Sequence, residues 1–340
     1  MNNDFQSRTE NISAEDAAGQ ILTLGFNGTS YSRALGSWFR KYRPGGVILF
    51  SGNIENVEQT TSLISDLKKL CEDETGTPLF VCVDQEGGRV SRLSKDMPSF
   101  PKARSLGEDG SLELVEEVYA DIGKTLRGLG FNVNFAPALD LDTNENNPII
   151  GDRSFGADPE TVGRLGSAAI RGLRREGILA CGKHFPGHGD TSLDSHLDLP
   201  TDDRPASRFD DAELIPFRMA VEERVDFIMS AHVVYPKLDE KYPATLSRKI
   251  MIDLLRDKIG FEGVIVSDDL DMKAIAGMWS DDEAAKLALN AGADMILVCH
   301  EGERQDNVFE ATYRMIDDGK LPEPDVKEKL ARLMSAKSCL

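Results

Sequence analysis

The chain has 340 residues, of which 40% are hydrophobic, enough for one large core or two modest ones. Its 58 acidic and 39 basic side chains give a formal net charge of −19, a balance that repels nucleic acid and anionic membrane surfaces and favours small or neutral substrates. Because no apolar run approaches ~18 residues, a transmembrane helix is excluded.

Residues 1–12 are polar, and we predict a flexible N-terminal segment there, followed by one folded domain over residues 13–340. The segment lacks a basic region followed by an apolar stretch, so no signal peptide is evident. The five cysteines are scattered and form no C-x-x-C pair, which is typical of reduced core thiols. These features predict a cytoplasmic protein.

From Ser13 onwards, short apolar strands alternate with helical segments over most of the chain. Ser13 begins a short helix with a capping-like start, and helical periodicity recurs over 112–129 and over 159–176, which Gly177 ends. Eight strands in about 300 residues predict an α/β fold, a single-domain (β/α)8 barrel. A doubly wound open sheet is the alternative, but no strand is followed by a phosphate-binding G-x-G-x-x-G. The predicted strands are 21–26, 46–50, 79–83, 132–136, 178–182, 227–231, 263–267 and 295–298.

Polar residues follow several of these strands directly. Asp84, Lys183, His232 and Asp268 each come just after an apolar strand. Because the active sites of such barrels lie at the carboxyl ends of the strands, these four side chains are predicted to converge on one pocket.

The acidic cluster after the seventh strand contains Asp268, Asp269 and Asp271. A carboxylate at the rim of a barrel can act as a nucleophile, a base or a metal ligand. For Asp269 and Asp271 the alternative is to cap the following helix, which aspartate does well near an N-terminus. Asp268 lies nearest the end of the strand, so it is the predicted catalytic residue.

Two further loops combine acids with arginines. Asp84 and Arg92 lie on either side of a Gly-Gly turn, and their groups suit bidentate hydrogen bonds to neighbouring hydroxyls, as on a sugar ring. Asp152 and Arg153 form another acid–arginine pair, which by chemistry alone could be a structural ion pair.

The loop after the fifth strand is the most unusual stretch of the chain. It holds three of the five histidines among glycines and aspartates. His188, Asp190, Asp194 and His196 are all metal-ligand types, but no H-E-x-x-H or H-x-H pattern accompanies them. We therefore predict no metal and assign the loop to other chemistry.

This loop also carries a resemblance to a known family. Residues 183–200 read KHFPGHGDTSLDSHLDLP, which resembles the signature K-H-F-P-G-H-G-D-T-x-x-D-S-H-x-x-L-P of family 3 glycoside hydrolases, specifically of their β-N-acetylhexosaminidase branch. The similarity covers nearly the whole chain, in the order that the family shows. The other similar stretches are 84–92, 132–137, 151–156, 230–233 and 263–270.

The resemblance implies a barrel enzyme that removes terminal β-linked N-acetylglucosamine with retention of configuration and without a cofactor. On matching positions, Asp268 would be the nucleophile and His196 the acid/base, with Asp194 as its partner. Retaining hydrolysis requires a nucleophile and an acid that later acts as a base, so these roles agree with the chemistry of the residues. The residues implied to bind the sugar are Asp84, Arg92, Arg153, Lys183 and His184.

We therefore expect a small carbohydrate partner and an exo-β-N-acetylglucosaminidase. The resemblance also suggests a role in cell-wall recycling, on N-acetylglucosamine linked to muropeptides. The sequence leaves three alternatives open: a phosphorylase of the same family, a β-glucosidase that differs around the 2-substituent, and a sugar-binding protein without catalysis.

Overall fold

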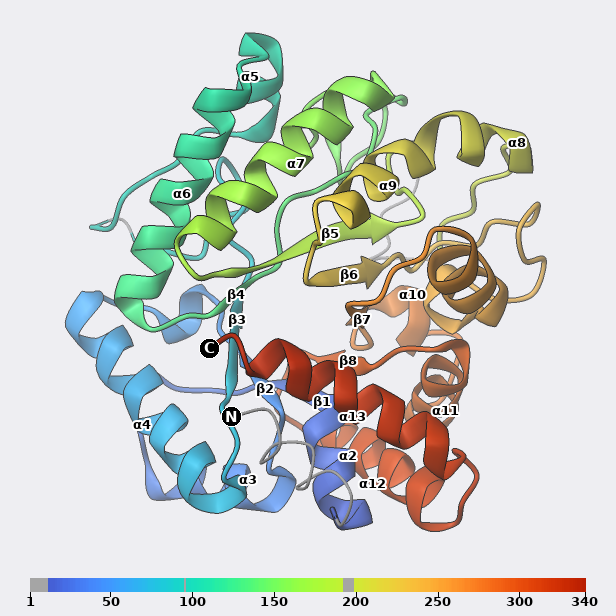
Figure 1. Ribbon diagram of the computed structural model, residues 1–340. Coiled ribbons are helices and arrows are strands. Elements are labelled where there is room, and N and C mark those ends of the chain that lie inside the picture. The colour runs from blue at the N-terminus through green and yellow to red at the C-terminus, as the bar shows by residue number, and fades with distance from the viewer. Residues whose placement is uncertain (1–11, 95, 192–198) are drawn as a thin grey trace.

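The computed structural model describes residues 12–94, 96–191 and 199–340, and it shows one closed barrel of eight parallel strands in sequence order (Figure 1). The predicted α/β barrel is confirmed. The helices surround the ring of strands, as Figure 1 shows. The strands are β1 (Leu22–Gly25), β2 (Gly46–Ile48), β3 (Phe80–Val83), β4 (Val133–Asn134), β5 (Leu179–Phe185), β6 (Phe227–Ser230), β7 (Val264–Asp269) and β8 (Met295–Val298).

Each strand pairs with the next one in parallel, and β1 pairs with β8 to close the ring. All eight predicted strands are present, with ends that differ by a few residues. The segment predicted to be flexible, residues 1–12, lies outside the described residues except for Ile12. The main helices are α2 (Ala14–Ile21), α3 (Arg33–Tyr42), α4 (Val57–Thr75), α5 (Ala103–Asp109), α6 (Leu112–Leu129), α7 (Pro159–Arg175), α9 (Leu214–Glu222), α11 (Asp281–Ala291), α12 (Glu303–Asp317) and α13 (Glu323–Lys337).

Alternation along the strands divides the buried residues between the inside of the barrel and the layer under the helices. In β3, Phe80 and Cys82 belong to one buried cluster, and Val81 and Val83 belong to the other. Successive side chains of a strand point to opposite faces, so an unbroken apolar run fills both spaces. Inside the barrel the ring of Phe80 meets that of Phe227 from β6 edge to face, with centroids 5.5 Å apart.

Helix boundaries follow local signals. Ser13, predicted to begin the first helix, accepts a hydrogen bond from the backbone of Asp16 at 3.0 Å. Asp158 caps α7 ahead of a proline, and the left-handed Gly130 ends α6 at the predicted residue. No helix within the described residues is long and apolar enough to cross a membrane.

The last turn of α13 reaches the end of the barrel at which the strands begin. Lys337 is 1% exposed, and its Nζ lies 5.2 Å from the centre of the Phe80 ring. The same Nζ donates a hydrogen bond to Oε1 of Gln20 in α2 at 2.7 Å. A buried ammonium group therefore joins α2, β3 and α13.

Two strands depart from a regular ladder. The register of β5 shifts between Gly182 and Phe185, and the register of β7 shifts between Val266 and Asp269. Both strands also extend further than predicted, because their last polar residues stay within the sheet. Bulges re-aim side chains next to binding sites, and these two carry Lys183 and Asp268.

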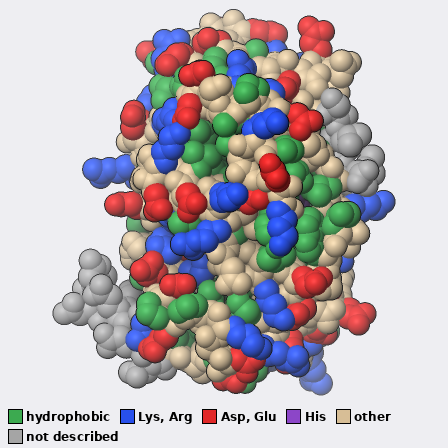
Figure 2. Space-filling model, turned by 90° about the vertical axis from the view of Figure 1, so that its right-hand side faces the viewer, with side chains coloured by type: hydrophobic (Ala, Val, Ile, Leu, Met, Phe, Trp, Pro, Cys, Tyr) green, Lys and Arg blue, Asp and Glu red, His purple; other side chains and the backbone are tan. Residues whose placement is uncertain are grey.

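Figure 2, a view of one side of the molecule, shows acidic and basic side chains interspersed on that face.

Candidate active site

A cavity of about 370 Å³ lies at the carboxyl ends of the strands. Two larger hollows, of about 600 and 690 Å³, lie elsewhere, and neither includes a residue from the carboxyl end of a strand. The cavity brings together all the predicted site residues that fall within the described part of the chain. These are Asp84, Arg92, Arg153, Lys183, His184 and Asp268.

Lys183 holds two carboxylates together at the base of the cavity. Its Nζ lies 2.8 Å from Oδ1 of Asp84 and 2.7 Å from Oε1 of Glu86, and its side chain is 2% exposed. Burial lowers the pKa of Lys183, but the two carboxylates outweigh burial and hold that pKa above its usual value. Lys183 is therefore a fixed cation.

Glu86 also fixes Arg153. The guanidinium donates from Nη2 to Oε1 at 2.7 Å and from Nε to Oε2 at 2.9 Å, and this bidentate contact sets the plane of the group. Burial raises the pKa of Glu86, but Arg153 and Lys183 outweigh burial and lower it well below its usual value. Asp152 pairs instead with Arg89 at 2.9 Å, so the alternative of an Asp152–Arg153 ion pair is wrong.

Asp140, which is completely buried, fixes the imidazole of His184. Nδ1 of His184 lies 2.7 Å from Oδ2 of Asp140, and the backbone N–H of His188 donates to Oδ1 at 2.7 Å. Nε2 of His184 lies 3.4 Å from Nη2 of Arg153, which can only donate. The contacts thus assign the proton to Nδ1 and turn the lone pair of Nε2 towards Arg153.

Asp268 lies in β7 and lines the cavity, with Oδ1 accepting a hydrogen bond from the backbone N–H of Asp269 at 2.8 Å. Withdrawal from water raises the pKa of Asp268, but His232, His184, that N–H group and Lys183 outweigh it and lower the pKa below its usual value. The carboxylate is therefore ionised at neutral pH, as a nucleophile must be.

Two other histidines are held by hydrogen bonds. Nδ1 of His232 lies 2.7 Å from Oγ1 of Thr245, and its Nε2 lies 2.9 Å from the carbonyl oxygen of Asp269. Nδ1 of His188 lies 2.9 Å from Oγ1 of Thr191. Burial and the neighbouring His184 lower the pKa of His188 to about 4, so this ring stays neutral at pH 7. His188 lines the cavity, whereas His232, predicted to converge on the same pocket, is completely buried and is not among its lining residues.

The predicted acid/base pair, Asp194 and His196, lies outside the described residues. The chain on both sides of this segment is tied to one arginine. Nε of Arg204 lies 3.1 Å from Oδ2 of Asp190 and 2.8 Å from Oδ1 of Asp202. Arg204 therefore joins the chain just before residue 192 to the chain just after residue 198.

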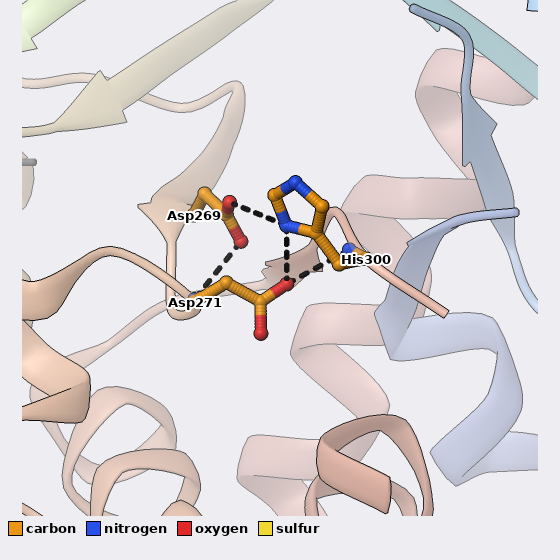
Figure 3. Close-up of side chains that lie close together, drawn as sticks. All are labelled: Asp269, Asp271 and His300. Carbon is orange, nitrogen blue, oxygen red and sulfur yellow. Dashed lines mark hydrogen bonds and ion pairs between the residues drawn. The ribbon is translucent and has the colours of Figure 1, made fainter. Parts of the chain in front are cut away.

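Asp269 and Asp271 do not cap the following helix, as they could have done. Oδ1 of Asp269 accepts hydrogen bonds from the backbone N–H groups of Asp271 and Cys299, each at 3.0 Å. Oδ2 of Asp271 accepts the backbone N–H of His300 at 2.8 Å and lies 3.2 Å from its Nδ1 (Figure 3). The two carboxylates instead join the end of β7 to the end of β8.

Burial and the charge of Asp271 raise the pKa of Asp269 to about 7. Ligand atoms of Asp269, Asp271 and His300 lie within 4.8 Å of one another, so this group could hold a metal ion. From the sequence, a metal ligand was one possible role for a carboxylate of this cluster, but a metal site was weighed only for the loop after β5, and His300 was not considered.

Sequence reasoning missed Glu86 and Asp140, both of which act on the predicted sugar-binding residues. A signal for Glu86 was its place two residues after Asp84, next to the same turn. Asp140 lies in an alternating Leu-Asp-Leu-Asp run, which marks an extended segment after the fourth strand but does not reveal its partner.

Comparisons with known proteins show which family the chain is similar to. Residues 14–336 match the family model of the glycosyl hydrolase family 3 N-terminal domain. A β-hexosaminidase from Chromobacterium violaceum is 40% identical over 296 residues, 85% of this chain and 79% of that protein. A β-hexosaminidase from Neisseria meningitidis serogroup B is 41% identical over 285 residues, 82% of this chain and 77% of that protein.

Solved structures show the same fold. A glycoside hydrolase family 3 β-N-acetylglucosaminidase from Paenibacillus sp. superposes with a TM-score of 0.94 and 40% identity. The match covers 97% of this chain and 63% of that one, so this chain spans less than two thirds of the Paenibacillus protein. A β-N-acetylhexosaminidase from Beutenbergia cavernae has a TM-score of 0.89 and 29% identity, with 96% and 99% of the two chains covered.

Proposed function

The chain belongs to family 3 of the glycosyl hydrolases, and we propose that it is a β-N-acetylhexosaminidase that releases terminal β-linked N-acetylglucosamine. The observation that carries this proposal is the position of Asp268. Its low-pKa carboxylate lines a cavity whose other polar groups are fixed by ion pairs before any substrate arrives. Preorganised groups of this kind cost no reorganisation when the sugar binds.

In the proposed mechanism, Asp268 attacks the anomeric carbon as the glycosidic C–O bond breaks, which gives a covalent glycosyl-enzyme. His196, oriented by Asp194, protonates the departing oxygen. Water then attacks the anomeric carbon while His196 takes its proton, and the configuration is retained. A histidine suits this exchange because its ordinary pKa lies near neutrality.

The remaining predicted residues would hold the sugar ring. Asp84 and Lys183 would exchange hydrogen bonds with ring hydroxyls, because a carboxylate accepts and an ammonium donates. Arg92 lies 3.6 Å from Asp84 through Nη2, and its buried Nε has no hydrogen-bond partner among the described residues. Arg153 and His184 complete the set, and their mutual geometry is set by Glu86 and Asp140.

We also propose that the natural substrate is a muropeptide fragment from cell-wall recycling, and that the protein acts in the cytoplasm without a cofactor. Arg89 and Arg92 line the cavity of a chain whose net charge is −19. Arg89, whose side chain is 47% exposed beside Asp152, would meet a carboxylate beyond the first sugar, as a muramyl peptide has. Comparing kcat/KM for N-acetylglucosaminyl-anhydromuropeptide and for N,N′-diacetylchitobiose would test this assignment.

One assay tests the activity itself. Turnover of 4-nitrophenyl N-acetyl-β-glucosaminide should greatly exceed turnover of the glucoside, and phosphate should leave the rate unchanged. A preference for the glucoside would point to a β-glucosidase. Release of the sugar 1-phosphate, with a rate that depends on phosphate, would point to a phosphorylase. Binding of N-acetylglucosamine without turnover of either substrate would indicate a sugar-binding protein.

A further inference from the structure

Two aromatic rings at the mouth of the cavity have no role in the mechanism above. Phe50 and His300 each lie two residues beyond the end of a strand, β2 and β8 respectively, and both of these strands pair with β1. Both side chains line the cavity that contains Asp268. Their rings are nearly parallel, with an interplanar angle of 15° and centroids 6.3 Å apart.

His300 is held in place although it is highly exposed. Its side chain is 79% exposed, yet Nδ1 lies 3.2 Å from Oδ2 of Asp271, which is itself bound by Nε of Arg304 at 2.9 Å. Figure 3 shows the Nδ1 edge of the ring towards the two carboxylates and the Nε2 edge directed away from them. An exposed ring that is fixed along one edge offers its open face at little entropic cost.

Phe50 is fixed as well. The guanidinium carbon of Arg92 lies 5.5 Å from the centre of its ring, a cation–π distance. Arg92 also approaches Asp84 in the deeper part of the cavity. The same arginine thus connects the predicted sugar-binding groups to the aromatic pair.

The exposed fractions of the side chains show how deep each one lies in the cavity. The Lys183 side chain is 2% exposed, that of Arg92 is 29% and that of His300 is 79%. An exo-acting enzyme places the terminal sugar in the deep part, so whatever is attached to that sugar extends towards the mouth. A pyranose ring has an apolar C–H face that suits a flat aromatic surface, whereas a flexible peptide or alkyl chain gains less from one.

We propose that His300 and Phe50 form a platform for a second pyranose ring, the one that carries the departing oxygen. This inference rests on the proposed function and adds the two residues that would bind the departing sugar. Asp271 is then a positioning residue, since it acts on the substrate only through His300.

The test is a ratio of two rates. For each variant, kcat/KM is measured on N,N′-diacetylchitobiose, which has a second ring, and on methyl N-acetyl-β-glucosaminide, which has none. His300→Ala should lower the ratio of the first value to the second about three- to tenfold, because one aromatic contact usually contributes a factor of that size to binding. Phe50→Leu, which keeps most of the volume, should lower the ratio in the same direction, and His300→Phe should largely restore it.

Met278→Ala is the matched control, because Met278 is 63% exposed and lies outside the cavity lining. Its ratio should equal that of the wild type. Unchanged ratios in both His300→Ala and Phe50→Leu, with melting temperatures like that of the wild type, would overturn the platform and leave the proposed function intact. A wild-type protein that hydrolyses neither substrate would refute the proposed function, and the platform with it.

Discussion

The carboxylate of Asp140 lies 2.7 Å from Nδ1 of His184 and has no exposed surface. Asp140→Asn should keep the size of the side chain but lose the charge, so the imidazole would no longer be fixed in one tautomer. We expect kcat/KM to fall about a hundredfold, because small displacements of a positioning group have effects of that order. The kinetic parameters of wild type and variant check this. Recovery in Asp140→Glu would support positioning, whereas an equal loss of melting temperature and activity in every variant would indicate a merely structural role.

Asp268→Ala should lower kcat by orders of magnitude while the fold is retained, because the variant has no nucleophile to form the glycosyl-enzyme. Asp269→Asn is a useful comparison, since Asp269 is the neighbouring carboxyl and binds backbone N–H groups instead. Mass spectrometry of trapped glycosyl-enzyme should place the sugar on residue 268. Near-wild-type turnover of Asp268→Ala, or a sugar on Asp269, would contradict the assignment.

His196→Ala should affect substrates according to their leaving group. A nitrophenolate leaves with little protonic help, but water still needs a base to release the sugar, so glycosyl-enzyme should accumulate on activated substrates. On disaccharides kcat/KM should fall further, since one well-placed acid or base contributes ~10²–10⁴-fold. Asp194→Ala should show the same pattern, and the double variant should lose less than the product of the two. An equal loss across leaving groups of graded acidity, without accumulation, would assign His196 to binding.

Removal of metal ions should leave turnover unchanged. The ionised Asp268 and the histidine acid/base need no Lewis acid in the proposed mechanism. Activity after exhaustive chelation, with metal content measured on the same sample, checks this. If activity is lost and zinc restores it, Asp271→Asn and His196→Ala locate the ion, because the first variant alters the group at the ends of β7 and β8 and the second alters the loop after β5.

Lys337 should make stability depend on pH in the alkaline range. Burial lowers its pKa from 10.5 to about 8. Between these values the unfolded chain binds more protons than the folded one, so the free energy of unfolding rises with pH from about 8 to 10.5. Below pH 8 the cost of the buried charge is fully present, and the total rise is at most about 3 kcal/mol.

Urea unfolding of Lys337→Met at several pH values checks this. In the variant, the free energy of unfolding should rise less steeply between pH 8 and 10.5 than in the wild type. Lys329, whose pKa burial also lowers to about 8, should contribute to the slope that remains. Lys320→Met is the control, since Lys320 is exposed and should leave the slope as it is in the wild type. Equal slopes in all three proteins would contradict the prediction.

The order of the strands and most residues of the cavity could be predicted from the sequence, because the signals for both are local. Each strand is a short apolar run, and the polar residues that follow it reach the same rim once the barrel closes. The ends of β5 and β7 were harder to predict. Lys183 and Asp268 are polar yet remain in the sheet, because the bulges turn them into the cavity.

Partners distant in the chain were also beyond local reasoning. Glu86 and Arg153 are 67 residues apart, and Asp140 and His184 are 44 apart. Their contacts are set by the closure of the barrel rather than by any spacing. Local reasoning instead paired Asp152 with Arg153 and gave Asp269 and Asp271 a capping role, because those alternatives involve only near neighbours.

The pairing of β1 with β8 bears on how the chain is made. Thr23 aligns with Leu297, so the hydrogen-bonding edge of β1 that faces β8 has no native partner until the last strand has been synthesised. At ordinary rates of translation that interval is on the order of tens of seconds. An open parallel edge of apolar residues is prone to pairing with other chains. Newly made chains should therefore depend on chaperones during synthesis, even though the finished barrel has no edge strand to protect.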